Sequence, residues 1–126
     1  MGIPDTGQSA ARALYAAARE GGAEVVALDE DVASGLAAAC DDLVAELERI
    51  AERGHGLDTV RGFPALPTGT GLARGFGAKG QEFLATVTAF QQTALFYKAA
   101  YLAAGRRFAD AEAAAGAAFA LAGGRS

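Results

Sequence analysis

The first candidate for ligand chemistry in this chain is the glycine-rich segment GFGAKG, residues 75–80. Its spacing matches the GxGxxG string in which glycine backbones approach a dinucleotide pyrophosphate where a helix begins. Such a site needs a preceding strand and an acidic residue about twenty positions later, whereas this chain has no strand before Gly75 and carries Lys98 there. A P-loop does not fit either, because Gln81 stands where Ser or Thr would bind magnesium. We interpret the glycines as a loose turn into a helix, and a nucleotide-binding enzyme is the third and weakest functional hypothesis.

Nucleophilic and metal chemistry have few candidate residues. The chain contains one histidine, His55, and one cysteine, Cys40. A zinc site needs several such ligands, and a nucleophile needs a positioned base. Cys40 falls among apolar positions of a predicted helix, where it is most simply a small buried hydrophobe. We therefore predict no enzyme, with no catalytic, cofactor-binding or metal-binding residue and no cofactor.

Two interleaved seven-residue ladders run through the C-terminal half. One contains Phe76, Phe83, Phe90 and Tyr97, and the other, offset by four positions, contains Val87, Ala94, Tyr101 and Phe108. Together they keep one stripe of a helix facing a neighbouring helix. We predict a helix–helix interface formed by Phe83, Val87, Phe90, Ala94, Tyr97 and Tyr101. A stripe of this length is typical of a binding or scaffold protein.

The elements around this stripe predict an all-α, bundle-like fold in one domain. We expect an N-terminal helix within 1–22, followed by a long antiparallel helical hairpin over 23–126, with helices at about 31–53 and 78–116. The first hairpin helix carries an apolar stripe of Val32, Leu36, Cys40, Leu43, Leu47 and Ile50. The second would be roughly 55 Å long, more than the roughly 35–40 Å diameter of a compact protein of this size. We expect it to bend at Gly105.

Residues 54–77 are predicted to form an extended loop, because glycines together with Pro64 and Pro67 interrupt the helical pattern. Apolar side chains inside this segment predict that it packs against the bundle. Phe63 and Phe76, with Gly77, are the candidate residues that plug it into place.

Charge divides the chain into two halves. The net charge is −4, but residues 1–54 hold 11 acids and 4 bases, whereas residues 55–126 hold 4 acids and 7 bases. Two halves of opposite net charge would attract each other as the arms of an antiparallel hairpin. Basic residues do not cluster beyond Arg106-Arg107, so we expect no nucleic-acid partner. No uncharged run is long enough for stable membrane insertion, and no cleaved signal peptide is expected.

The segment FADAE places Phe108 and Glu112 four residues apart on one helix face, and GFPALPTGTGLARGFGAKG fills residues 62–80. With the predicted hairpin, these features resemble the WXG-hundred (ESAT-six-like) superfamily of type VII secretion, and more closely its actinobacterial secretion-associated helical hairpins without tryptophan. Such proteins pair as hairpins into four-helix bundles, and many carry a Tyr-x-x-x-Asp/Glu secretion signal. Here Phe108 replaces the tyrosine and Glu112 is the acid. The chain has no Trp, so the Trp-x-Gly turn is missing, and its loop is longer.

The resemblance implies a non-enzymatic type VII secretion substrate or secretion-associated protein that acts through helix–helix association. Its partners would be a helical protein, as a homodimer or paralogous heterodimer, and a secretion ATPase or chaperone. It would be secreted without a cleaved signal peptide and be cytoplasmic before export. The alternative is a cytoplasmic helical adaptor or scaffold that is not exported.

Overall fold

The computed structural model describes residues 3–21, 27–54 and 67–124, and within these ranges all regular secondary structure is helical. The helices of this part are α1 (Gln8–Glu20), α2 (Glu30–Gly54), α3 (Pro67–Ala104) and α4 (Phe108–Gly124). This confirms the predicted all-α, bundle-like fold. None of these described helices is both long and apolar enough to cross a membrane.

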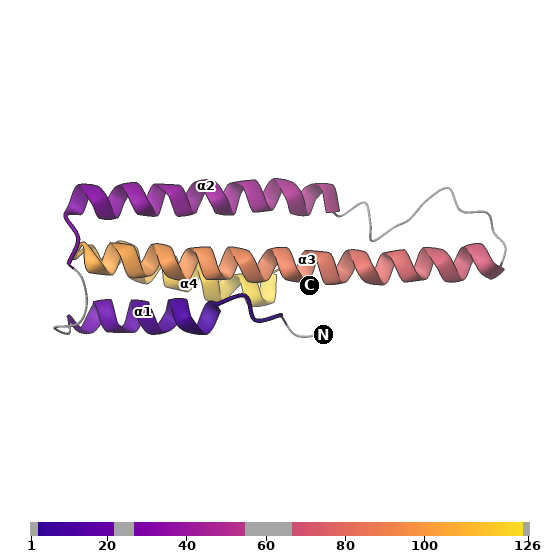
Figure 1. Cartoon of the computed structure of the whole chain (residues 1–126), viewed down its shortest axis with the longest axis horizontal. Coiled ribbons are helices and arrows are strands. Elements are labelled where there is room, and N and C mark those ends of the chain that lie inside the picture. Colours follow the sequence, from indigo (N-terminus) through magenta and orange to yellow (C-terminus); the bar gives the residue numbers. More distant parts are fainter. Residues whose placement is uncertain (1–2, 22–26, 55–66, 125–126) are drawn as a thin grey trace.

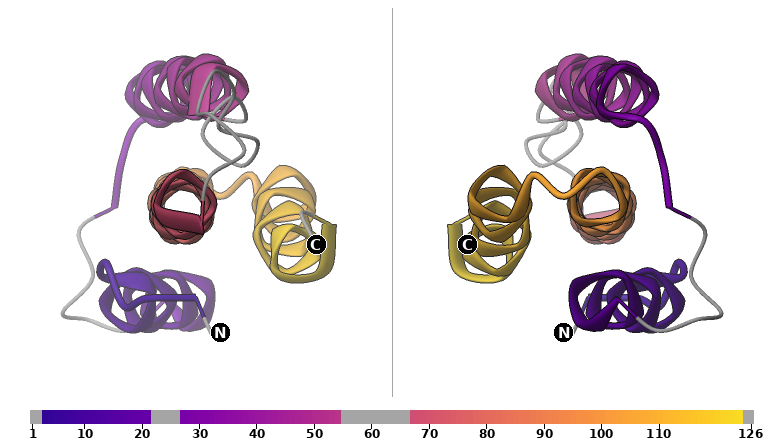
Figure 2. Two further views of the ribbon diagram at one scale, coloured as in Figure 1. Left: turned by 90° about the vertical axis from the view of Figure 1, so that its right-hand side faces the viewer. Right: turned by 90° about the vertical axis from the view of Figure 1, so that its left-hand side faces the viewer.

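Helix α3 is the axis of the molecule. The other three helices pack mainly against α3, and they lie on three sides of its C-terminal part (Figures 1 and 2). Helices α2 and α4 run antiparallel to α3, and α1 runs parallel to it (Figure 1). The first turns of α3 extend beyond the ends of the other helices (Figure 1).

The predicted antiparallel pair consists of α2 and α3. Near the middle of this pair, Lys98 Nζ donates to Asp41 Oδ1 at 2.7 Å. Towards the end of α2, the Gln91 amide donates to the carbonyl of Val44 at 3.2 Å. Beyond these polar contacts, Ala51 packs with Leu84 and Val87 in a separate small apolar cluster.

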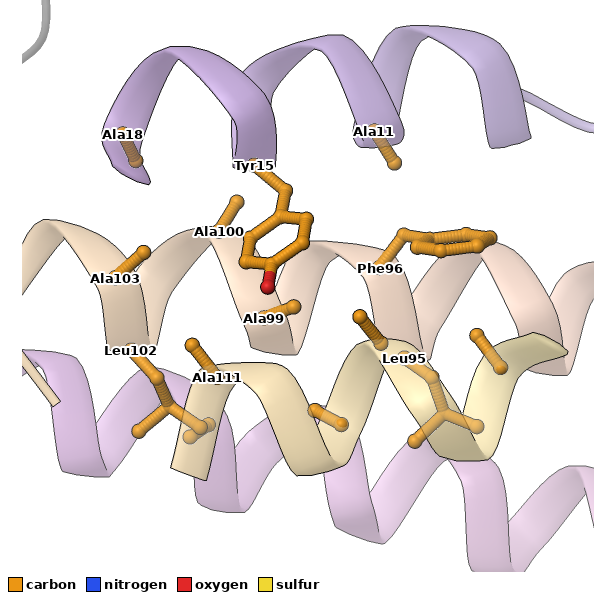
Figure 3. Packing of buried hydrophobic residues seen from close by; sticks show 14 residues of the cluster. Ala11, Tyr15, Ala18, Leu95, Phe96, Ala99, Ala100, Leu102, Ala103 and Ala111 are labelled. Carbon is orange, nitrogen blue, oxygen red and sulfur yellow. The ribbon is translucent and has the colours of Figure 1, made fainter. Parts of the chain in front are cut away.

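The main core is built largely from alanine. Tyr15 of α1 points at α3 between the alanines Ala99 and Ala100, with Phe96 beside it (Figure 3). Helix α4 contributes Ala111, Ala114, Ala115 and Ala118, all buried. Small side chains let helix axes approach closely, so most of the apolar burial is spread over many contacts of low individual value.

The second hairpin helix does not continue to residue 116 as predicted. It ends at Ala104, and α4 starts at Phe108 and runs back along α3. Arg106 adopts the left-handed conformation (φ 66°), and the N–H groups of Arg106 and Arg107 donate to the carbonyls of Ala103 and Leu102 at 3.0 and 2.8 Å. This is the Schellman pattern that closes a helix C-terminus. The expected bend is thus a complete reversal, which lets α4 bury its alanine face.

The predicted loop over 54–77 is also shorter than expected, because residues 67–77 belong to α3. Pro67 is the first residue of α3, where proline is favoured because that position needs no N–H donor for the helix. Pro67 therefore begins a helix and does not interrupt one, contrary to the prediction. Phe63 and the side chain of Phe76 lie outside the described residues, and the backbone of Gly77 is helical. The anchoring of the predicted loop by Phe63, Phe76 and Gly77 therefore stays a prediction.

The N-terminal helix falls inside the predicted range. Glycine ends this helix: Gly21 is left-handed (φ 67°), and its N–H donates to the carbonyl of Ala17. Just before α1, the hydroxyl groups of Thr6 and Thr93 lie 3.0 Å apart in a hydrogen bond. This contact holds the start of α1 against α3.

Candidate helix-association site

One side of α3 carries the aromatic ladder and is not covered by any helix of the described part. Figure 2 shows α4 on one side of α3, with α2 above and α1 below it, and no helix of the described part on the side opposite α4. Phe83 and Phe90 are 39% and 47% exposed. Tyr97, seven residues further on, shares their face and stacks with Tyr101 at a ring-centroid distance of 6.2 Å.

The predicted interface residues divide into two groups. Val87 and Ala94 are buried, and Val87 packs into the cluster shared with α2. Phe83 and Phe90 point to solvent, and Tyr97 and Tyr101 are half-buried. The stripe is therefore partly core and partly surface.

Helix α2 adds aliphatic side chains to the same side. Cys40 lies close enough to Tyr101 to influence its pKa. Val32, Leu36 and Leu43 lie on the same helical face as Cys40, and all three are exposed, Leu43 by 50%. We call the combined surface the uncovered face, formed by Phe83, Phe90, Tyr97 and Tyr101 of α3 and Val32, Leu36, Cys40 and Leu43 of α2.

The predicted stripe of α2 does not form the centre of its buried side. The residues of α2 that are fully buried are alanines: Ala33, Ala37 and Ala51. Leu47 and Ile50 are only partly buried, and Val32, Leu36 and Leu43 are exposed. The predicted stripe contained none of these alanines, although close helix packing favours the smallest side chains.

The uncovered face is electrically neutral near neutral pH. Burial, reinforced by the neighbouring Asp41 carboxylate, raises the pKa of the Cys40 thiol. Burial, together with Cys40 and Tyr97, raises the pKa of Tyr101. Both groups therefore stay protonated, so Cys40 is a weak nucleophile and the face is suited to apolar contact.

The described residues do not form a nucleotide-binding or metal-binding site. The GFGAKG segment lies within α3, so its amides belong to the helical hydrogen-bond ladder and do not form a phosphate-binding turn. The expected loose turn at these glycines is replaced by helix. Among the described residues, no group of three or more His, Cys, Asp or Glu side chains could hold a metal ion. His55 lies outside this part.

The structure brings Phe108 and Glu112 together on the first turns of α4, both exposed. They line a hollow of about 240 Å³ with Tyr15 and Arg19 of α1. Sequence reasoning missed these two α1 residues. They meet Phe108 and Glu112 only because α4 folds back along α3.

Comparison with known proteins adds no further residue to these sites. No family model, curated protein or solved structure matches the chain. The roles proposed below depend on the contacts, burial and charge described above.

Proposed function

We propose that this protein is non-enzymatic and works by helix–helix association through the uncovered face. The observation that carries this proposal is the exposure of Phe83 and Phe90 on the side of α3 that no helix of the described part covers. A whole aromatic side chain has about 150–250 Å² of surface, so each ring leaves roughly 60–120 Å² in water. Covering both rings would contribute roughly 3–6 kcal/mol to association.

The spacing of the aromatic rings favours a helical partner. Side chains seven residues apart form a straight row along α3, and such a row packs into the side of another helix. The whole face offers on the order of 500 Å² per copy, so two copies would bury about 1,000 Å², near the lower limit of specific interfaces. We therefore propose a reversible dimer, either of this chain or with a related helical chain.

In its more specific form, the proposal is that the protein is a substrate or partner of a type VII secretion system. The helical bundle and the exposed Phe108–Glu112 pair, which a secretion ATPase or chaperone can reach, support this form. One feature departs from the hairpins that the sequence resembles: the four helices of the described part belong to a single chain. The alternative is a cytoplasmic helical adaptor that associates through the same face.

The decisive measurement is the oligomeric state by light scattering across a range of protein concentrations. We expect the wild type to dimerise and Phe90→Glu to be monomeric, because a buried unpaired carboxylate costs several kcal/mol. Ala120→Glu is the matched control, since it adds the same charge on the exposed surface of α4. A wild type that stays monomeric at high micromolar concentration would refute self-association. Export assays, described in the Discussion, separate the secretion form from the adaptor alternative.

A further inference from the structure

A second surface lies on another side of the bundle, between α1 and α4. A hollow of about 420 Å³ there is lined by residues that include Arg12 of α1, Phe96 of α3 and Phe119 of α4. It shares Tyr15 and Arg19 with the smaller hollow beside Phe108 and Glu112. The two hollows therefore adjoin at Tyr15 and Arg19, and we call them together the α1–α4 groove.

Aromatic rings position both arginines of this groove. The guanidinium carbon of Arg12 lies 5.7 Å from the ring centroid of Phe96 and 5.1 Å from that of Phe119. These two rings contact each other edge to face at 5.2 Å. The guanidinium carbon of Arg19 lies 5.5 Å from the ring centroid of Tyr15. Such cation–π contacts orient a guanidinium without using its N–H donors.

Within the described part of the chain, neither Arg12 nor Arg19 has an acidic partner. Lys98 and Arg107, by contrast, are paired with Asp41 and Asp110. Glu112 lines the Arg19 end of the groove without forming an ion pair there. The groove therefore holds two positive charges that pair with no described carboxylate, and exposed aromatic side chains flank them.

We propose that the α1–α4 groove binds an acidic amphipathic helix of a protein partner, with Arg12 and Arg19 each pairing with one carboxylate. Charge complementarity requires the acids, since two unpaired guanidinium groups face the groove. Phe108 and Phe119, exposed by 42% and 55%, would meet the apolar side chains of that helix. Phe119 lies at the Arg12 end and Phe108 at the Arg19 end.

The arginine spacing favours a helix over an extended peptide. Arg12 and Arg19 are seven residues apart on α1, which corresponds to about 10.5 Å along the axis. A partner helix lying along the groove presents two acids at that distance when they too are seven residues apart. An extended strand covers the distance in about three residues, and side chains three apart in a strand point to opposite faces.

This site is separate from the uncovered face, although its Arg19 end includes the Phe108–Glu112 pair of the secretion proposal. Phe96 and Ala100 form the side of α3 that faces α1, whereas Phe83 and Phe90 lie on the uncovered face. A partner can therefore occupy the α1–α4 groove while the uncovered face is free or engaged.

Fluorescence anisotropy with synthetic peptides tests the proposal. The probe is a labelled alanine–leucine helix with two glutamates seven residues apart on its leucine face. One matched peptide carries glutamine in place of both glutamates. A second has its glutamates nine residues apart, which places them on opposite faces. We expect only the first peptide to bind well, with affinity lowered about tenfold by either Arg12→Gln or Arg19→Gln.

Two further variants sharpen this test. Glu112→Gln should strengthen binding of the acidic peptide about twofold to threefold. The change removes a negative charge beside Arg19 that repels the glutamates of the peptide. Arg53→Gln, at the exposed end of α2, should leave the affinity unchanged. Circular dichroism verifies that each variant stays helical.

Three results would overturn the proposal. The first is no binding of the acidic peptide at millimolar concentration, and the second is equal binding of the glutamine peptide. The third is preferential binding to phosphatidylglycerol vesicles, lost in Arg12→Gln, which would assign the arginines to an anionic membrane surface instead.

Discussion

Gly105, just after α3, lies so close to Ala33 near the start of α2 that a Cβ atom on Gly105 would overlap the Cβ of Ala33. A backbone hydrogen bond connects the segment before α2 to the end of α3 at the same place: the N–H of Leu28 donates to the carbonyl of Ala104 at 3.1 Å. The left-handed residue of the reversal is Arg106, not Gly105. Glycine is therefore needed at 105 because of close helix approach and not because of its backbone angles.

Gly105→Ala should lower the free energy of unfolding by about 1–3 kcal/mol, because the added methyl group overpacks the contact with Ala33. Ala33→Gly in the same chain should recover part of this loss, although Ala33→Gly alone costs about 1 kcal/mol in a helix. Urea unfolding measures all three variants. Gly116→Ala is the control: no atom lies within 4 Å of its added Cβ, so we expect a gain of about 0.5–1 kcal/mol. If Gly105→Ala were as stable as the wild type, the contact between residue 105 and Ala33 would not be tight.

Stability should fall at alkaline pH. The folded-state pKa values of Cys40 and Tyr101 are raised above the ordinary values of 9.0 and 10.0. The folded protein thus holds these protons more tightly than the unfolded chain does. The resulting contribution is complete below about pH 9 and is lost as the pH rises through the folded-state values.

Thermal unfolding between pH 7 and pH 11 tests this expectation. Cys40→Ala combined with Tyr101→Phe removes both titrating groups, so its melting temperature should decline less steeply above pH 9 than that of the wild type. An identical slope in both proteins would mean that the alkaline loss arises elsewhere.

The single cysteine reports whether the uncovered face is occupied. Cys40 is half-buried beside Tyr101, at a position that a partner helix would cover. We expect its reaction with a small thiol reagent to slow as protein concentration rises, because dimerisation restricts access. In Phe90→Glu the rate should no longer depend on concentration. A concentration-independent rate in the wild type would place any association interface elsewhere.

Glu112→Ala should stop export while changing the free energy of unfolding by less than about 0.5 kcal/mol, since Glu112 is an exposed helix residue. Phe108→Tyr should be exported normally, because Phe108 is 42% exposed and a hydroxyl group can reach solvent. The protein is measured in culture filtrate and in cells of a host that carries the secretion apparatus.

The export experiment has a matched control in Glu52→Ala, which removes an exposed acid from α2. If Glu112→Ala were exported like the wild type, FADAE would be ordinary helix surface. If the wild type itself stayed in the cells, the adaptor alternative would gain support.

Local sequence signals predicted the first two helices well. The helix expected at 31–53 is α2, Glu30–Gly54, because its acidic start and glycine end are local signals. The N-terminal helix lies within the predicted range 1–22 and ends at a glycine, Gly21, which is also a local signal. The seven-residue ladder on 83–97 is real, since spacing along a helix depends only on helix geometry.

Only the tertiary structure decided which faces are buried and how the C-terminal segment is arranged. Heptad spacing assigns residues to a common stripe, but it does not say whether alanines or large side chains face the neighbouring helix. The reversal at 105–107 joins residues from distant parts of the chain, as the contact of Gly105 with Ala33 shows. That reversal places Phe108 and Glu112 beside Arg19 of α1. Contacts of this kind arise from packing between helices, which the order of residues within one helix does not specify.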